Sequence, residues 1–399
     1  MKAQKQNIGS AGRTGATIRS DCHIQVKLRT KGGITIDVKS KVDSLYGKSI
    51  RSQIIGILKH FGVADATVSV EDAGAVPFVI AARVEAALKR SDPQFTANYL
   101  LGGMQYAKNS SRDRLRRTRL YLPGNEPQYF LNAGLHQPDG IILDLEDSVA
   151  PSEKDAARIL VRNALMNVNF GDAERMVRIN PLPEGLEDVR QVVHHNVETI
   201  LLPKCESAAQ IKNVDEEVNA LFEKRKSKRS VFLIPIIESA LGVVRAFEIA
   251  SASPWNCGLA IGLEDYTADI GVERTKNGIE SLFARSAIIN AAKAAGIQAL
   301  DSVFSDVQDD AGLRQSVLDA KAIGFEGKGC IHPRQIQIIH DAFTPTATEI
   351  EYAQRVVDAF KEAQRNGSGV VALGSKMIDA PVVKRAQRIL SLANNYSVK

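Results

Sequence analysis

Eight short apolar segments, separated by longer amphipathic stretches, occupy the chain from residue 117 to residue 342. Stretches such as SEKDAARILVRNAL and SLFARSAIINAAKAAG have their apolar residues at helical spacing. This alternation is typical of βαβ units, which build a parallel sheet. The expected strands are Arg119–Pro123, Gly140–Asp147, Met176–Asn180, Thr199–Lys204, Val231–Glu238, Leu259–Asp265, Ala299–Phe304 and Gly329–His332.

Eight strand–helix repeats in ~230 residues match the size of a (β/α)₈ barrel, with a doubly wound open sheet as the main alternative. We therefore predict an α/β protein of four parts. They are a small α+β domain over 1–92, a linker over 93–112, the barrel over 113–342, and a helical segment over 343–399 that serves as a lid or in oligomerisation.

The N-terminal part shows strand and helix periodicity in turn. Two alternating segments, IQVKLRT and ITIDVKS, flank the glycines at 32–33 and predict a β-hairpin. A helix is expected from Ile50 to Phe61, a strand over Ala66–Val70, and a second helix in the latter half of 78–90. The Gly- and Ser-containing residues before this domain are expected to form a flexible leader.

Hydropathy and cysteine usage exclude several classes of protein. No apolar stretch approaches the ~20 residues that span a bilayer, and no apolar run follows the basic start of the chain, so neither a membrane span nor secretion is expected. The four cysteines are far apart and form no CxxC pair, which argues against a zinc ribbon and a disulfide framework. We expect a cytoplasmic protein.

Positive charge is concentrated at the N-terminus. Residues 1–60 hold twelve Lys or Arg and three acids, a net charge of +9, whereas the rest of the chain carries −4. An anionic partner is one interpretation, and a solvated basic face is the other. Because the basic residues are scattered and few aromatic side chains accompany them, a phosphate-bearing group or an acidic protein surface is favoured over nucleic acid.

Charged residues gather where the expected strands end, and in a barrel that is where catalytic groups lie. Any one of these acids is equally typical of a helix N-cap or a surface charge. Several acids at one rim repel one another unless a cation lies between them, and carboxylates without Cys or His suit Mg²⁺. The residues are Asp144, Glu146, Asp147, Arg178, Lys204, Glu238, Glu264 and Asp265.

A magnesium ion on two carboxylates beside an arginine can bind a 2-oxo acid. The metal takes the keto oxygen and one carboxylate oxygen, and the guanidinium takes the carboxylate as a fork. The metal then acts as a Lewis acid. The pattern therefore indicates carbon–carbon cleavage or formation beside a 2-oxo acid.

A set of ordered motifs covers nearly all of 117–390. They read RTRLYLPGN, GIILDLEDSVAPSEKDAAR, MVRINPLPEG, ILLPKCES, FLIPIIESALG, AIGLEDYTADIG, GKGCIHPRQI and SKMIDAPVVKRA. In this order they resemble the citrate lyase beta subunit and its relatives of the HpcH/HpaI aldolase group, the malyl- and citramalyl-coenzyme A lyases. The resemblance implies a (β/α)₈ barrel, a homotrimer or hexamer, and Mg²⁺ bound by Glu238 and Asp265.

The same resemblance implies roles for further residues. Arg178 and Arg117 match arginines that contact the acid groups of the substrate. Asp379 of the KMID motif matches an aspartate that enters the neighbouring subunit's site and donates a proton to the thioester enolate. The sequence reads ALGSKMID where relatives often have ALDGKMID, but the aspartate is retained.

Residues around the second and fourth strands complete the expected site. Glu146 is expected among the catalytic residues and Lys204 among those that bind substrate. Asp144 and Asp147 are expected either to line the site or to anchor the strand.

The first ninety residues resemble the citrate lyase acyl carrier protein, which is normally a separate gamma subunit. AGRTGATIRSD, VDSLYGKSIRSQI and VSVEDAGAVPFVIAARVEAAL carry this similarity. It implies a phosphoribosyl-dephospho-coenzyme A arm on Ser20, with Ser10 as the other candidate. Arg19 stands where that family has an acidic residue, and Asp21-Cys22 stand where it has Gly-Asp.

These resemblances imply a carrier–lyase fusion. It would cut a 3-hydroxy-acyl group of the citryl type on its own carrier into an acyl thioester and a 2-oxo acid, oxaloacetate. A separate acyl-transferase (alpha) subunit is a possible partner. The alternative is a lyase for free coenzyme A thioesters, such as malyl- or citramalyl-coenzyme A, with the N-terminal domain as a docking module.

Overall fold

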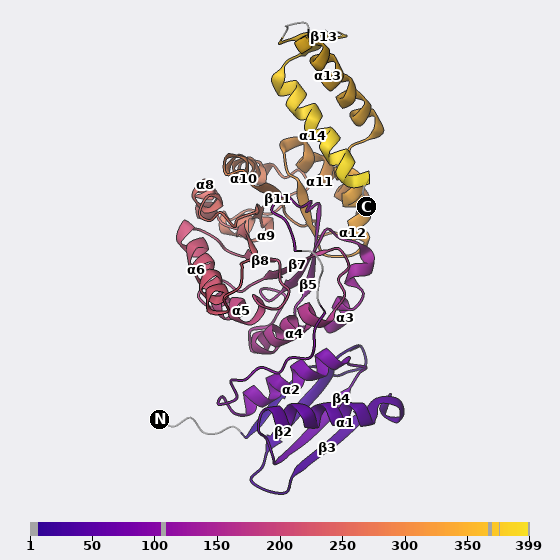
Figure 1. Cartoon of the computed structure of the whole chain (residues 1–399), viewed down its shortest axis with the longest axis vertical. Coiled ribbons are helices and arrows are strands. Elements are labelled where there is room, and N and C mark those ends of the chain that lie inside the picture. The colour runs from indigo at the N-terminus through magenta and orange to yellow at the C-terminus, as the bar shows by residue number, and fades with distance from the viewer. Residues whose placement is uncertain (1–6, 105–108, 366–368, 375, 398–399) are drawn as a thin grey trace.

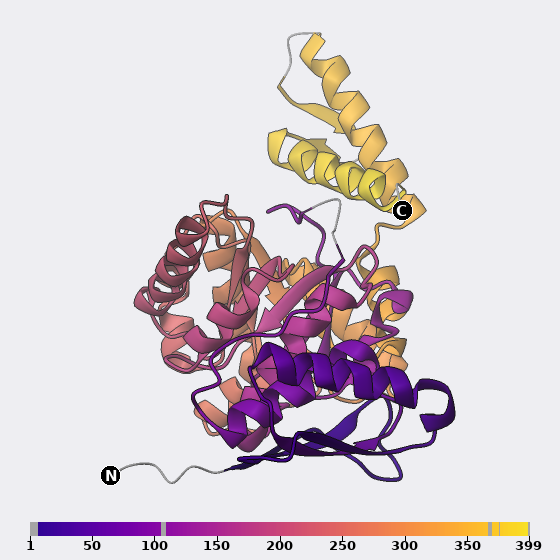
Figure 2. The ribbon, with the colours of Figure 1, turned by 60° about the horizontal axis from the view of Figure 1, so that its bottom comes forward.

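The computed structural model describes the chain except for residues 1–6, 105–108, 366–368, 375 and 398–399. Figure 1 shows three parts in sequence order along the long axis: a small N-terminal domain, a barrel, and a C-terminal helical hairpin. Figure 2 brings the N-terminal domain forward and shows the hairpin projecting from the other end of the barrel.

The N-terminal domain is a four-stranded sheet with two helices on one face (Figure 1). Its strands alternate buried and exposed residues, as expected for a sheet with one covered face. The order in the sheet is β1-β2-β4-β3. The elements are β1 (Ile8–Ala11), β2 (Cys22–Leu28), β3 (Ile34–Ser40), α1 (Asp43–His60), β4 (Ala66–Asp72) and α2 (Pro77–Ser91).

The expected hairpin between β2 and β3 is wrong. Strand β4 lies between them, antiparallel to β2 and parallel to β3. Helix α1 connects β3 to β4 as a crossover, and its buried residues Ile50, Ile54 and Ile57 need the face of the sheet for cover. The turn at Gly32 and Gly33 thus separates two strands that do not pair.

The expectation of a flexible leader is wrong for Ile8–Ala11. These residues form β1, in which Ser10 pairs with Gln25 of β2. Helix α2 packs so closely on β1 that a Cβ at Gly9 would lie 2.1 Å from the Ala87 carbonyl oxygen. Burying this short strand under the helix stabilises its position in the sheet.

The central part is a closed barrel of eight parallel strands, so the (β/α)₈ prediction is confirmed and the open sheet is excluded. Each strand runs as a short buried segment with helices outside it. The strands are β5 (Thr118–Pro123), β6 (Gly140–Asp144), β7 (Glu174–Arg178), β8 (Thr199–Leu202), β9 (Phe232–Ile237), β10 (Gly258–Ile261), β11 (Gln298–Asp301) and β12 (Gly327–Cys330).

The helices of the barrel surround these strands (Figure 1). They include three short 3₁₀ turns, η1 to η3. The bounds are α3 (Pro127–Phe130), η1 (Ala133–His136), η2 (Pro151–Glu153), α4 (Lys154–Asn167), α5 (Gly185–Val192), α6 (Ala208–Lys224), α7 (Ala240–Val244), α8 (Ala246–Ala250), α9 (Leu263–Asp269), η3 (Ile279–Ser281), α10 (Leu282–Ala294), α11 (Asp310–Ile323) and α12 (Arg334–Phe343).

The barrel has an apolar interior below the ends of its strands. Inward-facing side chains from different strands form one buried cluster, with Tyr121 of β5 packed against it. The filled interior leaves the carboxyl ends of the strands as the place for a site. The cluster contains Ile142, Met176, Leu201, Ile234, Ile236, Cys257, Ala260 and Leu300.

The N-terminal domain is docked on the barrel through α2 and α4, which run antiparallel. Arg162 of α4 donates to both oxygens of Glu85 on α2, at 3.1 and 2.7 Å, and both side chains are fully buried. At the other end of α2, Arg90 binds Asp155 with Nε–Oδ2 2.8 Å. These contacts hold the small domain against the side of the barrel.

The C-terminal part is a helical hairpin that extends from the barrel (Figure 2). Helix α13 (Ala347–Arg365) and helix α14 (Ala380–Ser397) pack together, with β13 (Val371–Leu373) and β14 (Lys376–Ile378) between them in sequence. Its own small core includes Val356, Ile378 and Val383. Among the described residues, no helix has the length and apolar character needed to cross a membrane.

Candidate active site

A cavity of about 460 Å³ lies at the carboxyl ends of the barrel strands. Polar residues from several strands meet there, because most of them lie at or just after the carboxyl end of their strand. The lining includes Arg119, Tyr121, Asp144, Asp147, Arg178, Glu238, Asp265, Asp301 and Ser302.

Glu238 follows β9 and is buried, with 6% of its surface exposed. Its Oε2 accepts a hydrogen bond from the backbone N–H of Lys204 at 2.7 Å. Burial, and then the nearby carboxylates of Glu146 and Asp265, raise the pKa of Glu238 to about 7. A cation at this carboxylate would offset both effects.

The backbone around Glu238 is shaped to admit its side chain. A Cβ at Gly262 would lie 2.5 Å from Glu238 Oε1, so only glycine leaves room for the carboxylate. Lys204 has a φ of +49°, a region that few non-glycine residues adopt, and its N–H points at Glu238 in this conformation.

Asp265 lies in the first turn of α9, half-buried, and lines the same cavity as Glu238. Two carboxylates at one cavity fit Mg²⁺, which proteins usually bind through one or two carboxylates, with water and substrate oxygens as further ligands. No group of three or more Cys, His, Asp or Glu side chains suited to a metal occurs in the described part of the chain. Glu238 and Asp265, the pair predicted to hold the ion, thus share one cavity, and their role as metal ligands stays a prediction.

Arg178 ends β7 and is the most heavily paired cation of the site. Its Nε and Nη2 donate to the two oxygens of Asp144 at 2.6 and 2.8 Å, and Nη1 lies 2.7 Å from Glu146 Oε2. Its guanidinium lies over the Tyr121 ring, 5.3 Å from the centroid. Asp144 thus occupies the Nε and Nη2 edge of the guanidinium, which we expected to bind the substrate carboxylate. The remaining nitrogen, Nη1, faces Glu146.

The Asp144 carboxylate anchors Arg178. Burial alone would raise the pKa of Asp144, but the hydrogen bonds and charge of Arg178 outweigh it and hold that pKa below its usual range. Asp144 also accepts the backbone N–H of Glu146 at 3.1 Å. Asp147, by contrast, is more than half exposed, and its Oδ2 lies 3.8 Å from Arg178 Nη1.

Glu146 and Lys204 form a second pair beside Arg178. Lys204 Nζ lies 2.8 Å from Glu146 Oε1, and this hydrogen bond raises the pKa of the lysine. Burial raises the pKa of Glu146 in spite of its two cationic neighbours. Glu146 therefore joins Arg178 to Lys204, with 2% of its surface exposed.

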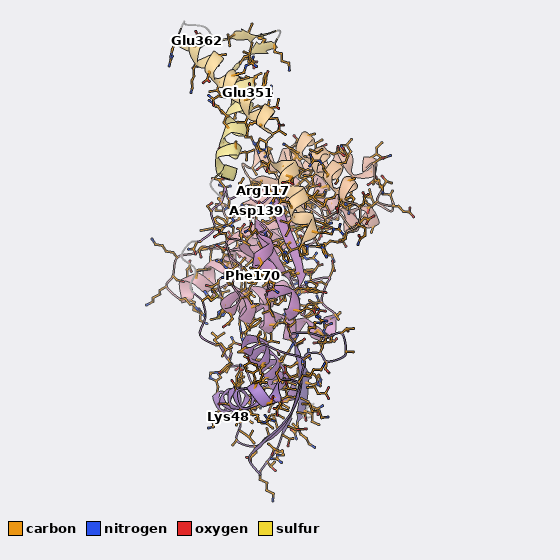
Figure 3. The ribbon with its side chains drawn as sticks, turned by 90° about the vertical axis from the view of Figure 1, so that its right-hand side faces the viewer. Lys48, Arg117, Asp139, Phe170, Glu351 and Glu362 are labelled. Carbon is orange, nitrogen blue, oxygen red and sulfur yellow. The ribbon has the colours of Figure 1, made fainter. Side chains whose placement is uncertain are left out.

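Arg117 does not lie in the site, and the expectation that it contacts substrate is wrong. It precedes β5, at the opposite end of the strand from the cavity, and its Nε and Nη2 bind the two oxygens of Asp139 at 2.8 and 2.9 Å. Figure 3 shows the two residues together inside the barrel region. The resemblance placed the arginine correctly in the motif, but the amino end of a barrel strand faces away from the site.

Asp379 lies in the projecting hairpin, between β14 and α14. Its Oδ1 accepts the backbone N–H of Val382 at 3.2 Å, as a cap of α14. It does not line the cavity that holds Glu238 and Asp265 in its own chain. A role for Asp379 in chemistry thus requires a neighbouring subunit and stays a prediction.

Ser20 lies in the loop between β1 and β2, half-buried, with a φ of +57°. The next residue, Asp21, forms a buried two-bond ion pair with Arg83, and Arg83 also donates to the carbonyl of Asn125 at 3.2 Å. Asn125 follows β5, so this loop lies beside the same rim as the cavity. Ser10 is in β1, and its carbonyl accepts from Arg90.

Several residues of the site were missed in the sequence, among them Asp301 and Ser302 at the end of β11. Arg119 and Tyr121 line the cavity from β5, and Lys154 of α4 donates to the carbonyls of Leu145 and Glu146 at 2.9 and 3.0 Å. The alternation of β5 was the available signal, because Arg119 is two residues from Tyr121 and shares its inward face. Nothing in the pattern indicated that Lys154 turns back to the loop.

Two family models match separate parts of the chain. One, described as HpcH/HpaI aldolase/citrate lyase, covers residues 117–333, and one described as malonate decarboxylase delta subunit (MdcD) covers residues 11–91.

Curated relatives match this chain over most of their own length. Citrate lyase subunit beta of Haemophilus influenzae is 42% identical over 286 residues, which is 71% of this chain and 98% of that protein. The subunit of Escherichia coli (strain K12) is 42% identical over 292 residues, 72% of this chain and 96% of that one. The mitochondrial citramalyl-CoA lyase of Homo sapiens is 34% identical over 297 residues, with 71% and 87% covered.

A solved structure shows the same architecture. Protein CitE from Mycobacterium tuberculosis, in complex with magnesium, acetoacetate and coenzyme A, matches with a TM-score of 0.60 and 33% identity. The match covers 71% of this chain and all of that one.

Proposed function

Because the chain belongs to the HpcH/HpaI aldolase/citrate lyase family, and is therefore a carbon–carbon lyase, we propose that it cleaves a citryl-type thioester carried on its own N-terminal domain. The products would be an acetyl thioester and oxaloacetate. One observation carries the proposal: the buried Glu85–Arg162 ion pair docks the carrier-like domain on the barrel, and Arg83 of that domain binds the Asn125 carbonyl beside the rim that holds Glu238 and Asp265.

Glu238 and Asp265 would hold one Mg²⁺. Their place at one cavity and the magnesium bound in the related CitE structure support this assignment. Bound there, the ion supplies Lewis-acid polarisation of the oxygen on the reacting carbon. Gly262 and the Lys204 N–H fix the Glu238 carboxylate in place for this task.

The bond that breaks joins the methylene next to the thioester to the carbon that bears the hydroxyl. The hydroxyl proton leaves to a base, the carbon–oxygen double bond of the oxo acid forms, and the electron pair of the broken bond passes to the thioester enolate. Asp379 of a neighbouring subunit would return a proton to the enolate carbon. Arg178, placed by Asp144 and Glu146, would bind the carboxylate of the oxo-acid half through Nη1.

Glu146 has a positioning role in this scheme. It is buried between Arg178 Nη1 and Lys204 Nζ, at 2.7 and 2.8 Å, so it sets where both cations lie. Lys204 is half-buried and is the cation that can turn toward substrate.

The carrier delivers its thioester in cis. Because the domain is docked, the arm on Ser20 would move rather than the domain. Delivery of the thioester to the barrel would then be intramolecular, at an effective concentration on the order of millimolar, as for a short flexible linker. The basic N-terminal segment complements the phosphates of the arm.

Intact-mass analysis of protein purified from its own host tests this function. The arm should add mass to the wild-type chain, Ser20→Ala should remove it, and Ser10→Ala should keep it as the matched control. If the Ser20→Ala chain still carries the added mass, the arm is attached to another residue. A wild-type chain without added mass, made together with the host's modifying enzymes, would overturn the carrier proposal.

A lyase for free coenzyme A thioesters is the second candidate. The 34% identity to citramalyl-CoA lyase favours it. The unmodified protein should then cleave citramalyl- or malyl-coenzyme A at rates that Ser20→Ala does not change, whereas the carrier function predicts loss of citryl cleavage in that variant.

The proposal extends to assembly and location. A homotrimer or hexamer would bring each hairpin to a neighbouring barrel, and a separate alpha subunit would load the carrier. All four cysteines are free and buried, which is consistent with a cytoplasmic enzyme.

A further inference from the structure

Arg119 is a fully buried arginine on the inner face of the barrel, and its charge is incompletely paired. Its Nη2 donates to the Asp301 carbonyl at 2.9 Å, whereas Nε and Nη1 have no hydrogen-bond partner in the described part of the chain. A guanidinium can bind a carboxylate through its Nε and Nη2 edge or through its Nη1 and Nη2 edge, and each edge includes one of these two unpaired nitrogens. The residue therefore still offers a donor on both edges.

Among the residues that the structure describes, no carboxylate forms an ion pair with this guanidinium. Asp301 is the carboxylate whose charge acts on Arg119, and it is already bound by Lys328 at 2.7 Å and by Arg285 at 3.1 Å. A buried cation left without a partner costs far more than one that is hydrogen-bonded to an anion. An arginine in this state fits a role in holding an anion that arrives from outside.

The cavity leads to this arginine. Arg119 lines the same space as Glu238, Asp265 and Arg178, two residues below Tyr121 on β5 and hence about 7 Å deeper along the strand. Both unpaired nitrogens are closed to water, so the guanidinium must turn toward the cavity to bind a ligand. That rotation breaks one hydrogen bond, to the Asp301 carbonyl.

The chemistry of the substrate determines what reaches this depth. The carbon that becomes the keto carbon carries three groups besides its oxygen. Under the proposed function, its carboxylate would lie beside Glu238, Asp265 and Arg178, and the acyl thioester would enter from the carrier at the rim. The third group, a methyl in pyruvate, a hydrogen in glyoxylate and a carboxymethyl in oxaloacetate, would then point into the barrel.

We propose that Arg119 is a specificity-determining residue that binds a second carboxylate on the oxo-acid half, so that the site selects dicarboxylic over monocarboxylic 2-oxo acids. This inference rests on the proposed function for the place of the metal and of the thioester. A methyl group in the same place would leave the buried donors unpaired, which is the situation in which polar sites reject analogues most strongly.

Calorimetric titration of the full-length protein with Mg²⁺ and two oxo acids tests the proposal without turnover. Oxaloacetate and 2-oxobutyrate differ mainly in the second carboxylate. The wild type should bind oxaloacetate about 100-fold more tightly, as two charge-assisted hydrogen bonds provide. Arg119→Met should reduce this ratio to less than about tenfold, and Arg119→Lys should fall between them because an ammonium keeps the charge but loses the fork.

Arg285→Met is the matched control, because Arg285 binds the same Asp301 but does not line the cavity. It should keep the wild-type ratio. A wild type without preference for oxaloacetate would overturn the proposal even if the variants do not fold, and so would an Arg119→Met protein that keeps the full preference. Mg²⁺-dependent binding of both acids without thioester cleavage would instead count against the lyase function and leave the role of Arg119 in place.

Discussion

Glu85 and Arg162 form a doubly hydrogen-bonded ion pair that joins the N-terminal domain to the barrel, and neither side chain is exposed. Lys89 and the Tyr99 backbone N–H also bind Glu85, at 2.8 and 3.0 Å. The burial of Glu85 would raise its pKa, but the hydrogen bonds and charge of Arg162 hold that pKa below its usual range.

Removing one side of this pair should loosen the docked domain. Glu85→Ala leaves Arg162 buried without its anion, and we expect a loss of about 3–5 kcal/mol in the free energy of unfolding. Denaturant titration measures this. Arg190→Gln, which removes the exposed pair with Glu217, is the control and should cost less than about 1 kcal/mol. Equal small losses in both variants would show that the buried pair does not hold the domains together.

Glu238→Gln should abolish magnesium-dependent cleavage while the fold persists. The amide keeps the size of the side chain but removes the charge that draws the cation. We expect Mg²⁺ affinity to fall by about 100-fold or more, since one of two carboxylates is lost. Calorimetric titration with Mg²⁺ measures the affinity, and circular dichroism checks the fold. Full activity of Glu238→Ala in excess chelator would refute this metal site.

Arg178→Lys should lose most activity although the charge is kept. A lysine cannot make the two bonds to Asp144 and the contact with Glu146 at once, so the cation is no longer held in place. We expect kcat to fall by about 100-fold, as for a misplaced positioning group. A lysine variant with unchanged kcat and KM would reduce Arg178 to a structural cation.

Complementation tests whether Asp379 acts in a neighbouring subunit. Asp379→Asn and Glu238→Gln chains, each inactive alone, should regain activity when they are mixed during refolding. A randomly mixed oligomer gives about a quarter of its sites both intact groups. Mixtures that stay inactive, although mixed oligomers are seen by native mass spectrometry, would place Asp379 outside the reaction.

His195 should make stability depend on pH. Burial and then the charge of Arg162 lower its pKa to about 4 in the folded protein, below the 6.5 of an ordinary histidine. The unfolded chain therefore binds a proton more readily, and the stability present above pH 6.5 is lost as the pH falls toward 4. Unfolding titrations across this range should show a loss of ~3 kcal/mol that His195→Gln reduces and His136→Gln does not.

The barrel and its site were predictable to different degrees. Short apolar segments with charged ends predicted the eight strands, because burial on both faces leaves a plain apolar run. The strands end earlier than expected, and Glu146 and Lys204 thus lie in loops whose course depends on bonds such as that of Lys154 to Leu145. Contacts of this kind join residues far apart in sequence and have no periodicity.

Two of the wrong predictions, a substrate contact for Arg117 and a β-hairpin of β2 and β3, have physical causes. Arg117 and Arg119 are two residues apart and share a motif, but one precedes the strand and binds Asp139, and the other lies inside the barrel. The predicted β-hairpin of β2 and β3 is wrong because β4, the strand that pairs with β2, comes about forty residues later in the chain. Local alternation identifies strands but not their neighbours in a sheet.

Under the proposed function, the docked carrier-like domain would also determine how the enzyme responds to concentration. An enzyme assembled from separate carrier and lyase subunits loses its carrier on dilution, and its turnover falls as the complex dissociates. Here one peptide chain fixes a ratio of one carrier-like domain to one barrel, and the buried ion pair between α2 and α4 joins them. Delivery of the acyl group should therefore be first order in this chain, with no excess carrier to compete for the barrel.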